Sequence, residues 1–245
     1  IVVAAYLMLT LVGMTHVHWA FAVLLVPLML GAAGYVNQRV LLNRVLDGGL
    51  LPPVLVTFGL SIIIQNALLE VFSADSRRLN AGWFDTASFR LTDQVAIGVL
   101  PLTMFLAAVA VIGGLQFIFY RTALGRMLRA TSDDPGIVPL MGASSAKVFA
   151  TATALASVVV GIAGIFLAMK TNFDPSAGPT RLIFAFQAVI IGGLGSLWGT
   201  LAGGVILGVA QTVGAQIDAG YQTLAGHLVF LAILIARPRG LFPRT

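Results

Sequence analysis

The stretch Val148-Phe-Ala-Thr-Ala-Thr-Ala-Leu-Ala-Ser-Val-Val-Val-Gly-Ile-Ala-Gly-Ile-Phe-Leu-Ala-Met169 holds 22 consecutive residues without one charged side chain. As an α-helix it would be about 33 Å long, because each helical residue adds about 1.5 Å. That length matches the roughly 30 Å hydrocarbon core of a bilayer. A backbone in lipid must satisfy its own hydrogen bonds, so this run predicts a transmembrane helix.

The rest of the chain repeats this pattern. Hydrophobic residues make up 58% of the 245 positions and charged residues only 9%, and the mean hydropathy is +0.98. A typical soluble domain carries about 25% charged residues, so lipid must be the solvent for much of this chain. We therefore predict an all-α, polytopic transmembrane helical bundle with about eight membrane segments. They are expected at 1–12, 17–36, 51–71, 95–119, 148–169, 183–195, 199–216 and 222–236.

Two of these segments need interpretation. Ile1–Val12 has no basic region before it and would span about 18 Å, which indicates the end of a helix that begins upstream in an N-terminally truncated chain. Segments 183–195 and 199–216 meet in a glycine-rich junction and could form one long helix, a hairpin or a re-entrant element. We favour two crossings, and we expect residues 1–245 to form a single transmembrane domain.

Basic residues alternate between the loops. One set of loops carries nine basic residues against three acidic ones: Arg39, Arg44, Arg121, Arg126, Arg129, Lys147, Arg237, Arg239 and Arg244, with Asp47, Asp133 and Asp134. The opposite loops hold five of each sign. Because cytoplasmic loops are enriched in Lys and Arg, loops 37–50 and 120–147 and the C-terminus are predicted to be cytoplasmic.

The loop 120–147 contains a short amphipathic pattern over Thr122–Ala130. Leu124, Met127 and Leu128 recur at helical spacing, while Arg126 and Arg129 are expected on the polar side. Such a helix can dock into a groove of a partner protein. It can equally be a basic loop that touches anionic lipid and fixes the topology, and the residues alone leave both interpretations open.

Four blocks in this sequence resemble the permeases of branched-chain amino acid ABC importers. Arg121-Thr-Ala-Leu-Gly-Arg-Met-Leu-Arg-Ala-Thr-Ser-Asp-Asp134, with Leu140-Met-Gly142, is similar to the cytoplasmic coupling loop of that family. Thr57-Phe-Gly-Leu-Ser-Ile-Ile-Ile-Gln-Asn66 resembles its third-helix signature. Ala188-Val-Ile-Ile-Gly-Gly-Leu-Gly-Ser-Leu-Trp-Gly-Thr-Leu-Ala-Gly-Gly204 and Arg237-Pro-Arg-Gly-Leu-Phe242 resemble its Gly-rich late segment and its ending. The blocks occur in order from about residue 50 onward and are most similar to the LivH type.

The resemblance implies a multi-pass inner-membrane permease that moves branched-chain or other amino acids inward. It implies a second homologous permease, two cytoplasmic ATP-binding subunits and an extracytoplasmic solute-binding protein as partners. The chain itself has no Gly-x-x-x-x-Gly-Lys-Ser/Thr loop, so we expect a transport subunit rather than an enzyme. The residues expected to contact the ATPase are Arg121, Leu124, Gly125, Arg126, Arg129, Ala130, Asp133, Asp134 and Gly142.

Ser61, Gln65, Asn66, Gly192, Gly193 and Gly195 are candidates for the translocation path. Buried amides are costly in lipid, so Gln65 and Asn66 are expected to face protein, where they line a path or join two helices. The glycines either open a path or serve packing alone. We expect no cofactor and no catalytic residue. We also expect no metal site, because His16 and His18 do not share a helix face.

Other functions remain open at this point. A related permease for urea or short amides would share the same blocks. An ion-driven secondary transporter would need buried ionisable residues in its spans, and almost none are present beyond Glu70 and His227. An intramembrane enzyme is disfavoured because no catalytic constellation is apparent.

Overall fold

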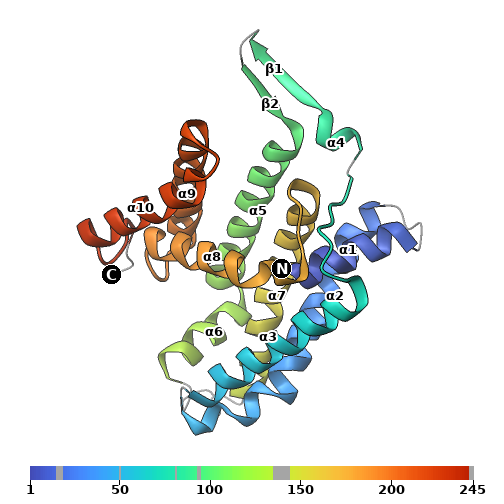
Figure 1. Cartoon of the computed structure of the whole chain (residues 1–245). Coiled ribbons are helices and arrows are strands. Elements are labelled where there is room, and N and C mark those ends of the chain that lie inside the picture. Colours follow the sequence, from blue (N-terminus) through green and yellow to red (C-terminus); the bar gives the residue numbers. More distant parts are fainter. Residues whose placement is uncertain (15–18, 50, 81, 93–94, 135–143, 243–245) are drawn as a thin grey trace. The chain divides into compact units, whose positions relative to one another are not determined.

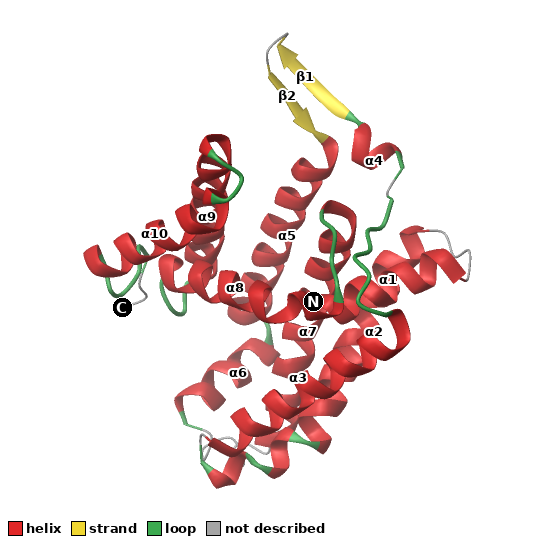
Figure 2. Ribbon diagram, viewed as in Figure 1, coloured by secondary structure: helices red, strands yellow, loops and turns green. Residues whose placement is uncertain are grey.

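The computed structural model describes residues 1–245 except 15–18, 50, 81, 93–94, 135–143 and 243–245. Helices dominate the described residues, which confirms the predicted all-α class (Figure 2). Five apolar segments are long enough to cross a membrane: Phe21–Arg44, Leu51–Phe72, Val99–Arg121, Ser145–Lys170 and Leu197–Ile217. The predicted count of about eight segments is not confirmed, because the remaining apolar helices are shorter.

The chain divides into two compact units. Unit 1 comprises Ile1–Phe105 and Phe117–Gly178, and unit 2 comprises Leu106–Gln116 and Pro179–Thr245. The long helix α5 (Val99–Arg121) contributes to both.

The core of unit 1 lies among helices α1 (Val2–Met14), α2 (Trp19–Val40) and α7 (Ser145–Lys170), labelled in Figure 1. Tyr6 is fully buried there, and its ring stacks on Phe72 at 4.4 Å and meets Phe173 edge-on at 5.0 Å. The contact between α2 and α7 is the most extensive in the unit. Small residues make it possible, since the Cβ of an alanine at Gly31 would lie 2.7 Å from the Val158 side chain.

Polar contacts fix both ends of this bundle. At one end, the Asn43 side chain, in the short 3-10 helix η1 (Leu42–Arg44), donates to the Ala146 carbonyl at 3.1 Å. At the other end, Arg77 and Phe173 exchange two backbone hydrogen bonds of 2.9 Å. The segments that follow α2 and precede α7 therefore lie together, opposite those that follow α3 (Leu51–Phe72) and α7. This agrees with the alternation of loops read from the charges.

A small β-hairpin precedes α5 and was not predicted. After the single turn α4 (Trp83–Thr86), strand β1 (Ser88–Thr92) pairs antiparallel with β2 (Val95–Gly98). The sequence analysis predicted residues 95–98 as the start of a membrane helix. Their backbone groups instead pair with strand β1. The helix α5 accordingly begins at Val99.

Unit 2 is built on α8 (Gly178–Gly192), α9 (Leu197–Ile217) and α10 (Tyr221–Ala236). The chain turns between α8 and α9, where Gly193 and Gly195 have φ angles of 99° and 86°. Ser196 then caps α9, because its hydroxyl accepts from the Gly199 amide at 3.0 Å. This break excludes one long helix over 183–216. The helix α8 has 15 residues and is about 22 Å long, so a full crossing by α8 stays a prediction.

Two further short helices complete the described elements. They are the 3-10 turns η2 (Leu46–Gly48), which follows η1, and η4 (Pro175–Ala177), which leads into α8. Asp174 caps η4, because its side chain accepts from the Ser176 amide at 2.7 Å. The turn η2 lies between α2 and α3, and η4 lies between α7 and α8.

Candidate functional site

The short helix α6 (Ala123–Asp133) occupies most of the described part of the predicted coupling loop. Thr122 separates it from α5, since its hydroxyl donates to the Ile118 carbonyl at 2.6 Å and accepts from the Gly125 amide at 3.2 Å. Gly125 itself lies directly against the backbone carbonyls of Ile118 and Phe119, where any Cβ would clash. The first turn of α6 is thereby pressed onto the last turn of α5.

One face of α6 is buried in unit 1. Leu128 packs with Val148 of α7, and the half-buried Leu124 joins this cluster. Thr131 is also buried and donates its hydroxyl hydrogen to the Met127 carbonyl at 2.7 Å. The predicted amphipathic helix is therefore present, with its apolar side on α5 and α7.

The two arginines of α6 have different surroundings. Arg129 is half-buried; it donates to the Phe119 carbonyl and its guanidinium lies over the Tyr120 ring at 5.2 Å. Arg126 is exposed, as is Met127. The sequence placed both arginines on one polar face, but a guanidinium can reach back one helix and satisfy a terminal carbonyl there. Arg129 thus ties α6 to α5, and Arg126 remains on the surface.

The other residues of the predicted ATPase contact are distributed around this surface. Arg121 and Asp133 are exposed, Asp134 is exposed at the end of α6, and Ala130 is half-buried. Gly142 lies outside the described residues, as do His16 and His18. The exposed part of α6 offers a cation, a flexible thioether and carboxylates to whatever covers it.

The path candidates of α3 are largely exposed in this chain. Ser61 and Asn66 are exposed and Gln65 is half-buried. The Asn66 amide donates to the Ile62 carbonyl of its own helix at 2.8 Å. No described residue of α3 is buried, so lipid or another protein must cover this apolar helix.

The glycine candidates of unit 2 lie in a tight corner. Gly192 is buried against the backbone of Gly199, and Gly193 is buried against Gly240. Gly195 is exposed in the turn. The tail that follows α10 returns here: Leu241 donates its amide hydrogen to the Ile191 carbonyl at 2.9 Å, and Phe242 donates to Gly192 at 3.1 Å. Backbone packing accounts for Gly192 and Gly193, and their place on a path stays a prediction.

Unit 2 also contains a polar pair that the sequence analysis did not single out. The buried Gln187 of α8 has its amide nitrogen 2.5 Å from Nδ1 of His227 on α10, and Phe184 stacks on that imidazole at 5.7 Å. An amide within the apolar run Leu182–Ile191 was the available signal, because such a group demands a partner in lipid.

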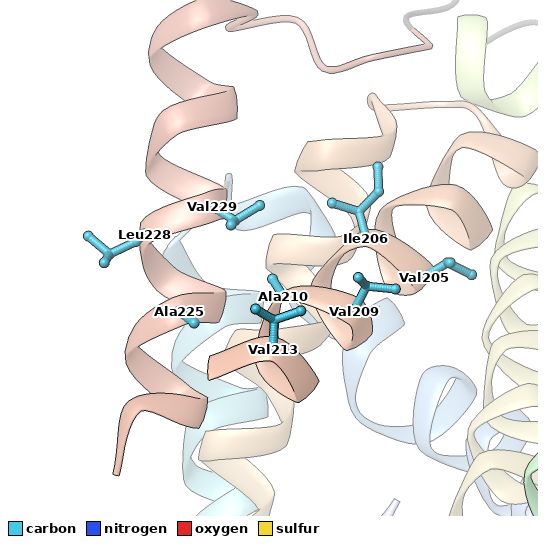
Figure 3. Close-up of a pocket in the computed structure, with 8 residues that line it drawn as sticks. All are labelled: Val205, Ile206, Val209, Ala210, Val213, Ala225, Leu228 and Val229. Atoms are coloured by element: carbon cyan, nitrogen blue, oxygen red, sulfur yellow. The ribbon is translucent and has the colours of Figure 1, made fainter. Parts of the chain in front are cut away.

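An apolar groove runs between α9 and α10 (Figure 3). It is lined by Val205, Ile206, Val209, Ala210, Val213, Ala225, Leu228 and Val229. None of these side chains can hydrogen-bond, so the groove cannot hold the two charged groups of an amino acid. Its surface instead suits hydrocarbon.

Comparisons with known proteins were made over the whole chain. The family described as "Branched-chain amino acid transport system / permease component" matches residues 1–237. The permease protein BraD of a high-affinity branched-chain amino acid transport system of Pseudomonas aeruginosa is 29% identical over 236 residues, which cover 89% of this chain and 76% of BraD. LivH of Escherichia coli is 27% identical over 221 residues, 87% of this chain and 70% of LivH. The fructose import permease FrcC of Rhizobium meliloti is 28% identical over 221 residues, 82% of this chain and 58% of FrcC. No solved structure matches.

Proposed function

Because the chain belongs to the family of branched-chain amino acid transport permeases, we propose that it forms part of the path by which such an amino acid enters the cell. The chain is a multi-pass inner-membrane permease component of an ABC importer, and ATP is hydrolysed in separate subunits. Importers of this kind work with ATPase and solute-binding components.

The position of α6 is the observation that carries the coupling proposal. Its exposed side presents Arg126 and Met127, while Gly125, Leu128 and Arg129 attach it to α5 and α7. A cytoplasmic ATPase that binds the exposed side would move α6 and, through these contacts, the ends of two long helices. Loop 120–147 thus converts ATPase closure into a helix movement that opens or closes the path.

The exposed apolar surfaces of the long helices indicate partner proteins. No described residue of α3 is buried, and in α5 only Val99 and Leu100 at its start are buried, so we infer that a second permease covers part of these two apolar helices. Two ATP-binding subunits and an extracytoplasmic solute-binding protein complete the assembly. From the positive-inside rule we infer that α6 and the tail lie in the cytoplasm.

The solute is a branched-chain amino acid, and Ser61, Gln65 and Asn66 of α3 with the glycines 192, 193 and 195 are its proposed path. BraD and LivH carry that substrate class in their names, whereas FrcC is named for fructose. Uptake of labelled leucine, fructose and urea by the reconstituted importer separates these possibilities. Fructose or urea uptake without leucine uptake would reject the proposed solute.

The charge reversal Arg126→Glu tests the coupling surface. It should lower ATPase co-purification and leucine uptake by about tenfold, since reversing a charge at an interface costs on the order of 1–2 kcal/mol. Arg90→Glu is the matched control, because Arg90 is also exposed but lies in the β-hairpin at the opposite end of α5. Membrane insertion should be normal in both. Unchanged uptake with Arg126→Glu rejects the docking role of α6.

A further inference from the structure

The end of unit 2 exposes two arginines beside large apolar side chains. Arg237 and Arg239 are exposed in the tail, next to Phe242, which is 54% exposed. The α8–α9 turn adds Leu194, which is 74% exposed, and the first turn of α9 adds Trp198, which is 47% exposed. We call these five residues the tail surface.

The tail surface has a fixed position. The amides of Leu241 and Phe242 donate to the carbonyls of Ile191 and Gly192, which are the last two residues of α8. Gly240, with a φ angle of 83°, fits closely over Gly193. Trp198 is held as well, because its indole nitrogen donates to the Gln116 side chain. These contacts hold Arg237 and Arg239 close to the C-terminal end of α8.

Its positive charge is not balanced within unit 2. Asp218 is the sole acidic residue in 179–245, and 106–116 contains none. It follows α9, 20 positions after Trp198, which is about 30 Å away along the helix. This surface therefore favours a ligand that carries negative charge.

An apolar groove lies deeper along the same two helices. Its last residue on α10, Val229, precedes Arg237 by eight positions, or about 12 Å of helix. Figure 3 shows the lining side chains of α9 and α10. A cationic and aromatic rim with a hydrocarbon groove below it has the chemical profile of a phospholipid, with its phosphate at the interface and its chains in the core.

We propose that the tail surface binds the headgroup of an anionic phospholipid, whose acyl chain lies in the groove between α9 and α10. The charge favours an anionic headgroup over a zwitterionic one, and the groove favours a lipid over the ATPase. The site is independent of the transported solute, so it can be tested without any transport activity.

Trp198 supplies the readout. The chain has three tryptophans, so Trp19→Phe with Trp83→Phe leaves Trp198 as a single fluorophore. The full chain is reconstituted in vesicles with equal mole fractions of phosphatidylglycerol and phosphatidylcholine, and bromine quenchers are placed on one lipid or the other. Brominated phosphatidylglycerol should associate with Trp198 about tenfold better than brominated phosphatidylcholine, because each arginine near an anionic surface contributes several-fold.

Two variants and a control complete the experiment. Arg237→Gln/Arg239→Gln should abolish the preference, and Ala210→Phe should weaken it by filling the groove. Arg181→Gln, at the start of α8 in the same unit, should leave it unchanged. If the arginine variant does not fold, high salt should reduce the preference in the parent chain.

Three outcomes would overturn the proposal. Equal quenching by both lipids shows that the arginines select no headgroup. Inorganic phosphate that abolishes the preference at millimolar concentration indicates a site for a free anion. A Trp198 signal that responds to added ATPase subunits and not to phosphatidylglycerol assigns the tail surface to a protein partner.

Discussion

Two glycine contacts, one in each unit, differ in what lies opposite the glycine. Between α2 and α7 of unit 1, Gly31 and Gly34 make room for the side chains of Val158 and Ser157 on the neighbouring helix. At the α8–α9 corner of unit 2, Gly192 and Gly199 make room for each other's backbone. A side chain can change its rotamer to accept an added methyl group, but a backbone held by helix hydrogen bonds cannot. Substitution should therefore be tolerated better at Gly31 and Gly34 than at Gly192 and Gly199.

Gly192→Val should have the largest effect. The new side chain overlaps the backbone of Gly199 and the amide nitrogen of Thr200. We expect the free energy of unfolding to fall by about 3 kcal/mol, which is at the upper end of the usual cost of overpacking substitutions. The measurement is thermal unfolding in detergent with size-exclusion chromatography. Gly204→Val is the control, because nothing lies within 4 Å of a Cβ at Gly204; equal losses for both would refute the contrast.

Gly34→Ala tests the softer contact in unit 1. Its Cβ would meet the Ser157 side chain, with the Ser157 Cβ at 2.7 Å. Rotation of the hydroxyl relieves part of the overlap, so we expect a loss of about 1–2 kcal/mol. Adding Ser157→Gly should return most of it. A loss as large as that of Gly192→Val, without recovery in the double variant, would show that the two glycine contacts are alike.

His227→Leu examines the polar pair of unit 2. It removes the partner of the Gln187 amide and leaves that group buried without one among the described residues, at a cost of about 1–2 kcal/mol. The double variant with Gln187→Leu should regain stability, because an apolar pair has no unmet hydrogen bond. A double-mutant cycle of melting temperatures measures this. Additive losses would instead mean that each side chain acts through separate contacts.

Thr153→Val should have the smallest effect and is the counterpart in unit 1. Thr153 donates to the Gln38 side chain at 2.8 Å, but Gln38 also donates to Asn43 at 3.0 Å and keeps that partner. Interhelical hydrogen bonds in membranes average about 0.6 kcal/mol, and we expect a loss of that size. A loss above that of His227→Leu would reverse the order of the two polar contacts.

Local pattern was enough to predict the helical elements of this chain. The uncharged run 148–169 lies within α7, and Leu124 and Leu128 predicted the buried side of α6. Local pattern was not enough where a distant group completes a bond. Val95–Gly98 forms a strand because Ser88–Thr92 pairs with it. Arg129 does not extend from the polar face into solvent, because its guanidinium donates to the Phe119 carbonyl.

The limits of the predicted segments have a similar explanation. The segment expected at 183–195 begins earlier, at Gly178, since the capped turn η4 leads directly into α8. It ends at Gly192, where the chain adopts a positive φ angle at Gly193. Glycine permits such an angle without requiring it, so the sequence favoured two crossings but did not exclude one long helix.

The sequence by itself determined the solvent and the class of this protein: with 58% hydrophobic and 9% charged residues, long segments must enter lipid, and lipid requires helices. Its ordered blocks also indicated the permease family. Only the tertiary structure decided that the tail bonds to Ile191 and Gly192, that Gln187 meets His227, and that Arg129 binds α5 while Arg126 stays exposed. Hydropathy is a sum over neighbours in the chain, whereas these contacts join residues ten to fifty positions apart and depend on how the helices pack.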